Sequence, residues 1–303
     1  MSKVVGIGAC VMDTLITIPQ FPKEDTKLRA DSTKLVGGGP TASGIVAVSK
    51  LGVSSEFIGV LSDDSTGSFL KSDFEKYGVK TDNIDLLKGY RAFQSCIWLN
   101  SEKATRTCVF DKGDLPALKL DDNKVEAIKS AEVLMVDGNE MDAAVEAAKI
   151  ARENGVKVLY DCGGLYPNVD KLLALTDIMI PSEEFSIGHT GESNAADAAK
   201  KLYEMYKPLY VVVTRGSKGG LIYDGETIIE YPCYPVEVKD SNGAGDIFHG
   251  AFASAVVRGF SPLQCCHFSS AVSAIKCTGV GARESVPDFD TTIEFLRRNG
   301  YEL

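Results

Sequence analysis

Apolar and polar positions alternate along the chain in blocks that predict strands followed by helices. Residues 3–13, "KVVGIGACVMD", predict a buried strand that runs into a turn, with Asp13 at its end. Residues 37–52 predict a glycine turn followed by a helix, and residues 55–79 a strand, a loop and a helix. Further strands are expected at 131–138, 156–164, 177–184 and 208–216, and helices at 140–155 and 195–206. This alternation predicts an α/β fold with a doubly wound, mainly parallel sheet flanked by helices.

Two segments, about 14–35 and 94–111, do not follow this alternation. Their apolar and polar residues alternate one by one, which is typical of half-buried strands. We therefore expect a small separate β-sheet, inserted in a single domain that covers residues 1–303. Such a sheet can close over a site as a lid, and its apolar face favours a homodimer formed through the lid.

Composition narrows the classes of function. The 303 residues are 44% hydrophobic and carry a net charge of −10, without a basic block. This argues against nucleic acid or an anionic membrane as the main partner. The first residues lack the features of a signal peptide, and no apolar run reaches the roughly 18 residues of a membrane span. Eight cysteines without a C-x-x-C pair, beside three histidines, predict free thiols in the cytoplasm and no zinc site.

The segment "DSNGAGDIFHGAF", residues 240–252, carries the strongest chemical signal. Gly243, Ala244 and Gly245 stand directly before Asp246 and the expected start of a helix. Small residues let backbone N–H groups converge, and the helix adds its positive end, a combination that binds phosphate oxygens. Asp246 would then lie where it can accept a proton from an attacking hydroxyl. A glycine turn with an aspartate helix cap is the alternative that these residues leave open.

Four segments together resemble the ribokinase-like, or PfkB, family of sugar kinases. They are "GGGPTASGIVAVSKLG", "VVVTRGSKGG", "DSNGAGDIFHGAF" and "AVSAIKCTGVGARESVPD". They occur in the family's order and span nearly the whole chain. Within the family, "FPKEDTKLR", "FQSCIWLN", "GGGP", "FHGA" and "IKCT" look most like the ketohexokinase and sulfofructose kinase branch.

The resemblance implies a role for each matching position. Asp246 would be the catalytic base, and Gly243, Ala244 and Gly245 would form the anion hole. The implied sugar contacts are Asp13, Gly38, Gly39, Ser43, Gln94 and Asn139, and the implied nucleotide contacts are Thr214, Gly216 and Gly219. ATP and Mg²⁺ are the implied cofactors. The resemblance further implies a monovalent cation such as K⁺, held mainly by backbone carbonyls near Asp240, Asn242 and Ser285.

The chain departs from the family pattern at several positions. Where many members have Asn-x-x-Glu, this sequence has Ser182 and Phe185, so Glu183 is our candidate for holding magnesium through water. Asn139 stands where the resembled branch carries an arginine, which favours a neutral sugar over an anionic one. Arg106 on the expected lid could face either sugar or solvent, and His249 is expected only to pack at the helix start.

These features together predict an ATP-dependent kinase that phosphorylates a primary hydroxyl of a small sugar, a ketose in our interpretation. A nucleoside or vitamin-precursor kinase on the same scaffold is one alternative, and a catalytically silent ligand-binding protein is another. A dinucleotide-binding fingerprint in "GIGAC" is excluded, because the third glycine would fall on Val11 and no helix follows.

Overall fold

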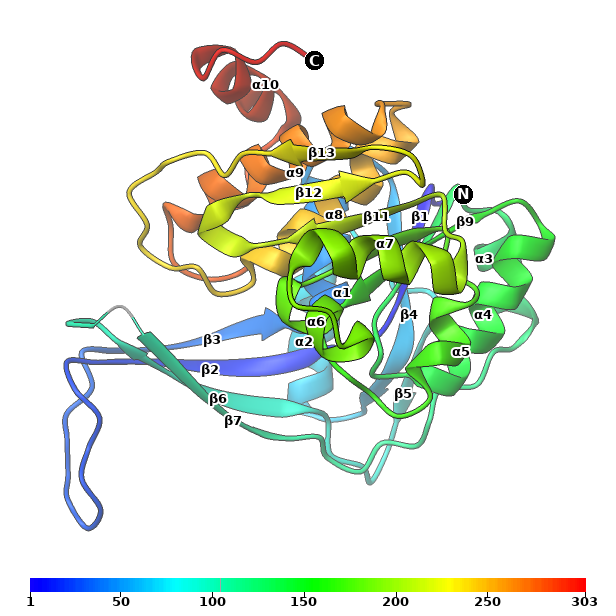
Figure 1. The fold of residues 1–303 in the computed structure, drawn as a ribbon. Helices are drawn as coiled ribbons and strands as arrows, with labels where there is room; N and C mark the ends of the chain where they lie inside the picture. Colours follow the sequence, from blue (N-terminus) through cyan, green and yellow to red (C-terminus); the bar gives the residue numbers. More distant parts are fainter. Residues whose placement is uncertain (104) are drawn as a thin grey trace.

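The computed structural model describes residues 1–303 except position 104, and its described part is organised around one large sheet (Figure 1). The strand order is β13-β12-β11-β10-β9-β8-β1-β4-β5. The strands are β1 (Val4–Ile7), β4 (Ser55–Ser62), β5 (Ile84–Leu87), β8 (Val133–Val136), β9 (Lys157–Cys162), β10 (Ile178–Pro181), β11 (Tyr210–Thr214), β12 (Gly220–Tyr223) and β13 (Ile228–Tyr231). Pairing is parallel from β5 to β11 and antiparallel from β11 to β13, which confirms the predicted fold class.

Helices cover both faces of this sheet. One face packs against α1 (Pro40–Lys50), α2 (Ser65–Lys76), α8 (Ala244–Val257), α9 (Pro262–Cys277) and α10 (Phe289–Arg298). The other packs against α3 (Asp122–Lys129), α4 (Met141–Glu153), α5 (Val169–Leu173), α6 (Glu183–Thr190) and α7 (Ala195–Tyr206). In β8, Val133 and Met135 join the first layer, whereas Leu134 and Val136 join the second. Because both faces are covered, the strand is apolar throughout.

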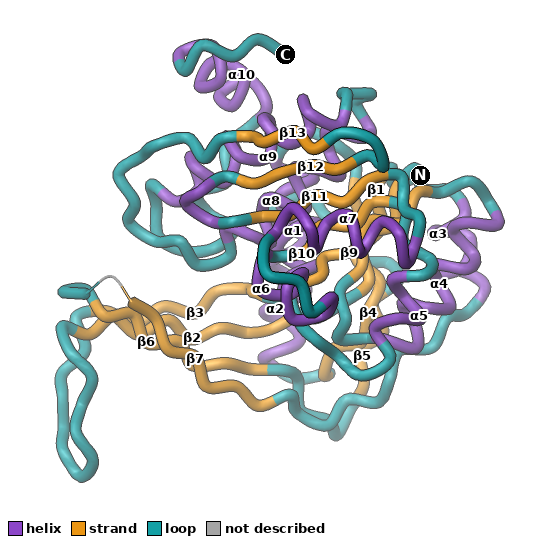
Figure 2. The backbone as a smooth tube through the Cα atoms, in the orientation of Figure 1, coloured by secondary structure: helices purple, strands orange, loops and turns teal. Residues whose placement is uncertain are grey.

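A second, smaller sheet projects from the body, at the lower left of Figures 1 and 2. Its order is β3 (Ser32–Gly38), β2 (Val11–Ile18), β6 (Gln94–Asn100) and β7 (Thr105–Asp111). Two antiparallel pairs, β2–β3 and β6–β7, are joined by the parallel pair β2–β6. The expected separate sheet is therefore confirmed. Leu15, Val36 and Ile97 form its small core.

The prediction for Asp13 was wrong in one respect. The apolar run 3–13 is not one strand: β1 ends at Ile7, and Asp13 is the third residue of β2 in the smaller sheet. The chain leaves the large sheet between them because the amide of Ala9 donates to the Asp137 carboxylate, at 3.0 Å. A Cβ on Gly8 would lie 2.2 Å from that same carboxylate, so the close approach requires glycine.

All eight cysteines are unpaired, as expected. In the described part of the chain, no helix is both long and apolar enough to cross a bilayer.

Candidate active site

The site lies where the strand order of the large sheet reverses direction. From β1 the chain proceeds to β4 and β5 on one side, and later to β8 and β9 on the other. Loops at the carboxyl ends of β1 and β8 therefore diverge, and ligands of open α/β sheets bind at such points.

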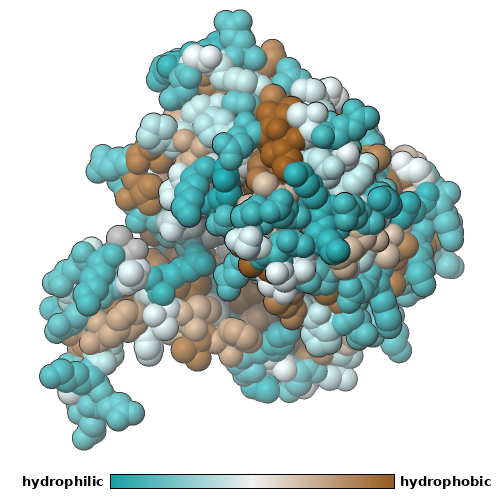
Figure 3. Space-filling view, viewed as in Figure 1, coloured by the Kyte–Doolittle hydropathy of each residue, from teal (hydrophilic) through white to brown (hydrophobic). Residues whose placement is uncertain are grey.

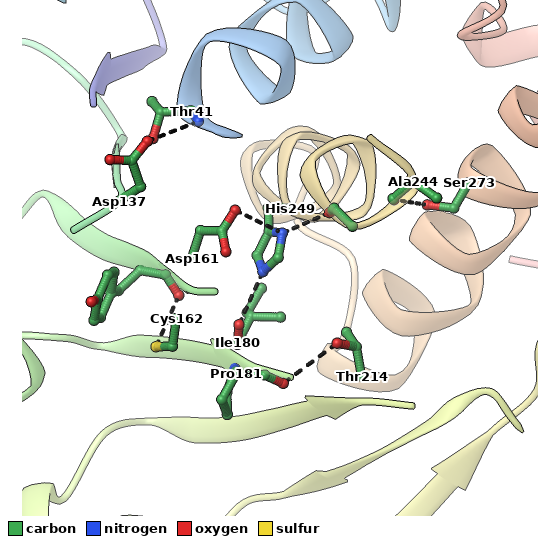
Figure 4. A network of polar contacts seen from close by, with 12 residues as sticks. Thr41, Asp137, Asp161, Cys162, Ile180, Pro181, Thr214, Ala244, His249 and Ser273 are labelled. Atoms are coloured by element: carbon green, nitrogen blue, oxygen red, sulfur yellow. Dashed lines mark hydrogen bonds and ion pairs between the residues drawn. The ribbon is translucent and has the colours of Figure 1, made fainter. Parts of the chain in front are cut away.

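Asp137, which directly follows β8, organises this reversal point. It is 2% exposed, and its carboxylate accepts the amide of Thr41 at 3.1 Å (Figure 4). It also accepts the amides of Asn139, at 2.9 Å, and of Ala9. It thus joins the end of β1, the start of α1 and the loop after β8. Sequence analysis missed Asp137, although a carboxylate placed directly after the apolar run "VLMV" was a signal.

Asp13 and the two predicted glycines lie together on the small-sheet side. Asp13 is buried, and its Oδ1 accepts the Ser95 hydroxyl at 2.5 Å. A Cβ on Gly38 would lie 1.9 Å from Asp13 Oδ2, and Gly39, with φ 97°, leaves no room for one against the Ala9 carbonyl. Burial raises the pKa of Asp13, the Ser95 hydrogen bond opposes this, and the negative charge of Asp246 raises it further. Asp13 and Asp246 therefore share one electrostatic environment.

The other predicted sugar contacts, Ser43, Gln94 and Asn139, lie in three different parts of the structure. Ser43 is fully buried on α1, where Arg283 Nε donates to its hydroxyl at 3.5 Å. Gln94 is exposed at the start of β6. Asn139 donates to Asp137 and lines a cavity of about 170 Å³ that also reaches Lys112. Contacts of these three residues with a sugar stay predictions.

The predicted anion hole forms the start of α8. Gly243 caps the helix with φ 75°, and a Cβ there would lie 2.6 Å from that of Ala282. The Ala244 amide donates to the Ser241 carbonyl at 3.2 Å. The amides of Gly245 and Asp246 have no acceptor within the described residues. Two donors at the positive end of a helix are thus available to an anion.

The Asp246 carboxyl lies in the first turn of α8, among charges that affect its ionisation. Burial raises its pKa, His249 lowers it, and the negative charge of Asp137 raises it again. Arg106 and Lys276 contribute smaller lowering effects. The pKa of this carboxyl is therefore raised above its ordinary value.

His249 does more than pack at the helix start. Its ring nitrogens lie 2.6 Å from the Gly245 carbonyl and 2.9 Å from the Ile180 carbonyl, and Nδ1 lies 3.3 Å from Asp161 Oδ2 (Figure 4). Backbone carbonyls thus contact both nitrogens of the buried ring, and the Asp161 carboxyl lies beside Nδ1. Burial raises the pKa of Asp161 to about 7, and His249 opposes this shift. Sequence analysis missed this buried pair.

The three predicted nucleotide residues line one cavity of about 480 Å³. Thr214 ends β11, and the short helix Gly216–Lys218 leads to Gly219. A Cβ on Gly219, with φ 77°, would lie 2.2 Å from the Tyr231 carbonyl. The same cavity reaches the start of α8, and its other walls include Tyr231, Val236, Phe248, Ala244 and Gly245. It therefore offers an apolar, partly aromatic end and a helix N-terminus.

The residues that replace the family's Asn-x-x-Glu have structural roles. Ser182 caps α6 by accepting the Phe185 amide at 3.1 Å, and Phe185 is 2% exposed in the core. Glu183, in the first turn of α6, is half-buried. No group of three or more potential metal-binding side chains gathers among the described residues. Magnesium binding through Glu183 stays a prediction.

Arg106, whose orientation the sequence left open, faces the loop before α8. From β7 its Nη1 donates to Asn242 Oδ1 at 3.0 Å. The smaller sheet therefore reaches across to residues 240–243, the loop before α8 that we call the anion-hole loop. Figure 3 shows the surface hollowed between the smaller sheet and the body.

Comparison with known proteins identifies the class. The model of the pfkB family carbohydrate kinases matches residues 1–288, and the chain belongs to this family. It is a carbohydrate kinase with a ribokinase-like fold. It is 29% identical to a ribokinase of Haemophilus influenzae, over 96% of this chain and 97% of that protein. It is 26% identical to a nucleoside kinase of Methanocaldococcus jannaschii, over 99% of this chain and 98% of that protein.

A solved structure supports the same assignment. The Arabidopsis thaliana ribokinase complexed with ribose and ATP superposes with a TM-score of 0.88, at 25% identity, over 98% of this chain and 99% of that one. Membership of the ketohexokinase and sulfofructose kinase branch stays a prediction.

Proposed function

We propose that this carbohydrate kinase transfers the γ-phosphate of ATP to a primary hydroxyl of a small sugar, and that the sugar is a ketose. Asp246 would act as the general base. The observation that carries the proposal is the start of α8 at one end of the 480 Å³ cavity. Ala244 and Gly245 line that cavity, and Asp246 follows them in the same helical turn. The ribose and ATP bound by the Arabidopsis relative support it.

The residues would divide the reaction as follows. The apolar end of the cavity would hold the base of ATP, and the α8 amides would neutralise charge on the γ-phosphate. Asp13 would accept hydrogen bonds from two sugar hydroxyls and fix their orientation. Asp246 would accept the hydroxyl proton while the new O–P bond forms and the bond to ADP breaks.

The family resemblance implies two ions, Mg²⁺ and K⁺. Mg²⁺ bound with ATP shields phosphate charge, and Glu183 is the residue we propose to hold it through water. For K⁺, the carbonyls of Asp240 and Asn242, which the sequence suggested as ligands, already accept hydrogen bonds from Lys276 Nζ, and this argues against a K⁺ requirement. Ser285, the third predicted ligand, lies half-buried against Gly279.

We propose further that the smaller sheet is a lid within one domain, residues 1–303, and that its exposed apolar side chains mediate a homodimer. Leu35, Val109 and Phe110 are 52%, 59% and 60% exposed on it. A closed lid would exclude water that competes with the sugar for the phosphoryl group. Sedimentation velocity tests the dimer, and a monomer at every concentration would refute it.

A panel of acceptors tests the function. The purified chain is mixed with Mg-ATP and ketoses, aldoses or nucleosides, and ADP release is measured for each. We expect ketoses to give the largest kcat/KM. Preferred turnover of nucleosides would favour the alternative function, a nucleoside kinase, which the nucleoside kinase of Methanocaldococcus jannaschii supports. No ADP release with any acceptor would overturn the kinase proposal.

Replacing Arg106 with glutamine is expected to lower kcat/KM about tenfold, because a charge-assisted hydrogen bond to the anion-hole loop is lost. The bond lies at the exposed edge of the small sheet, so the difference from wild type should shrink as ionic strength rises. Steady-state kinetics at low and high salt measure both effects. Arg29→Gln, which removes the same charge from the exposed loop between β2 and β3, is the matched control. Equal losses in the two variants would contradict a specific role for Arg106.

A further inference from the structure

A fully buried lysine lies behind the candidate anion hole. Lys276, in the last turn of α9, is 0% exposed, and its Nζ donates to the backbone carbonyls of Asp240, at 2.9 Å, and Asn242. It forms no salt bridge with any described carboxylate. Burying an ammonium group without a charged partner is costly, and lysine is rarely found fully buried. The two carbonyls therefore partly offset the cost of burying this charge. Core packing alone does not explain a charged side chain at this position.

The bonds to Lys276 determine which way the anion-hole loop faces. In a planar trans peptide, the carbonyl of one residue points opposite to the amide of the next. Carbonyls of Asp240 and Asn242 turned toward Lys276 thus turn the amides of Ser241 and Gly243 away from it. Ser241 lines the 480 Å³ cavity, and its amide has no acceptor among the described residues, so it is an available donor on the side of the loop opposite Lys276.

Other contacts fix the same loop to the end of α9. The Asp240 carboxylate accepts the amides of Asn242 at 2.8 Å and Gly281 at 2.9 Å. The amides of Lys239 and Asp240 donate to the Cys277 carbonyl, next to Lys276, at 2.8 and 3.2 Å. The ammonium group is thus held at a fixed place beneath the start of α8, where its charge adds to the helix N-terminus.

We propose that Lys276 is a positioning residue for phosphoryl transfer: its ammonium group orients the anion-hole loop and supplies the positive charge behind it, so that this enzyme needs no monovalent metal ion there. This inference rests on the proposed kinase function. Burial lowers the pKa of Lys276, and the nearby Asp240 and Asp246 carboxylates oppose that effect. The titratable or charged groups around it are Asp240, Asp246, Cys277 and Arg106.

Lys276→Met tests the proposal, because methionine fills similar space without charge or donors. We expect kcat to fall about 10²-fold, as when an oxyanion-hole donor is removed, with little change in the KM for the sugar. The emptied carbonyls should then bind K⁺ or NH₄⁺. Either ion, at constant ionic strength, should restore kcat about tenfold and raise the Tm of the variant by binding the folded state. The wild type should respond to neither ion.

Control variants separate charge from packing. Lys276→Gln keeps a donor without the charge, so it should fold well and still lose kcat. Lys200→Met removes an exposed lysine from α7, on the other face of the sheet from α8 and α9, and should match the wild type. If Lys276→Met does not fold, the kcat of Lys276→Gln and the response of the wild type to K⁺ test the proposal instead.

Three results would overturn the proposal. They are activation of the wild type by K⁺, near-normal kcat in Lys276→Gln, and a folded Lys276→Met whose kcat and Tm ignore both ions. The Tm response to K⁺ needs no turnover, so it remains informative if the acceptor panel shows no kinase activity.

Discussion

Replacing Asp246 with asparagine is expected to lower kcat about 10³-fold or more while the protein stays folded. Asparagine has nearly the same shape, but its amide cannot take the proton of the attacking hydroxyl. The α8 amides remain, so the affinity for ATP should change little. Rapid-quench measurement of the chemical step, with circular dichroism for folding, gives the result.

Asp290→Asn is the matched control, because Asp290 is an exposed carboxylate in the first turn of α10, away from the site. It should retain wild-type turnover, which separates a lost base from a general weakening of helix-dipole interactions. An Asp246→Asn enzyme with near-normal turnover would remove Asp246 from the base role.

The pH profile gives an independent check on the same residue. Burial raises the pKa of Asp246, and the base must be ionised to accept a proton. The kcat/KM of the wild type should therefore rise with pH through an acid limb above the ordinary carboxylate range. An acid limb at the ordinary range would contradict the raised pKa.

Sequence reasoning succeeded where local structure depends on contiguous residues. The segment 243–246 fixes its own geometry, since a left-handed glycine, two small residues and an acid begin one helix. Thr214, Gly216 and Gly219, at and just after the end of the parallel strand β11, line the same cavity as Gly245 at the start of α8. Strand alternation likewise predicted the main sheet and the separate small one.

Sequence reasoning failed where a role depends on partners far along the chain. Asp137 receives amides from Ala9 and Thr41, more than 90 residues away, and no local pattern encodes that arrangement. Asp161 and His249 are likewise far apart in sequence, at 88 residues. The break between β1 and β2 was missed because the apolar run continues across Gly8, and burial alone does not say which sheet a residue joins.

Arg283 is the clearest case of such a long-range partner, and its replacement should have the largest effect on stability. It is 1% exposed, and its guanidinium contacts Asp73 at 2.6 Å and donates to the Gly38 carbonyl at 2.8 Å. We expect Arg283→Met to lower the free energy of unfolding by about 3 kcal/mol, because the mostly buried Asp73 carboxylate loses its partner. Urea unfolding measures the change. Arg298→Met, which breaks an exposed pair with Glu294, should cost under about 1 kcal/mol.

A double variant tests whether the unpaired charge is the cause. If Arg283→Met is destabilising because Asp73 loses its partner, adding Asp73→Asn should recover about half of the lost free energy of unfolding. In the wild type, Asp73→Asn alone should lower the free energy of unfolding. Additive losses would instead assign the effect to the lost Gly38 and Ser43 contacts. In that case the guanidinium acts mainly by holding the glycine turn beside Asp13, and kcat/KM for the sugar should fall in Arg283→Met even where the protein is fully folded.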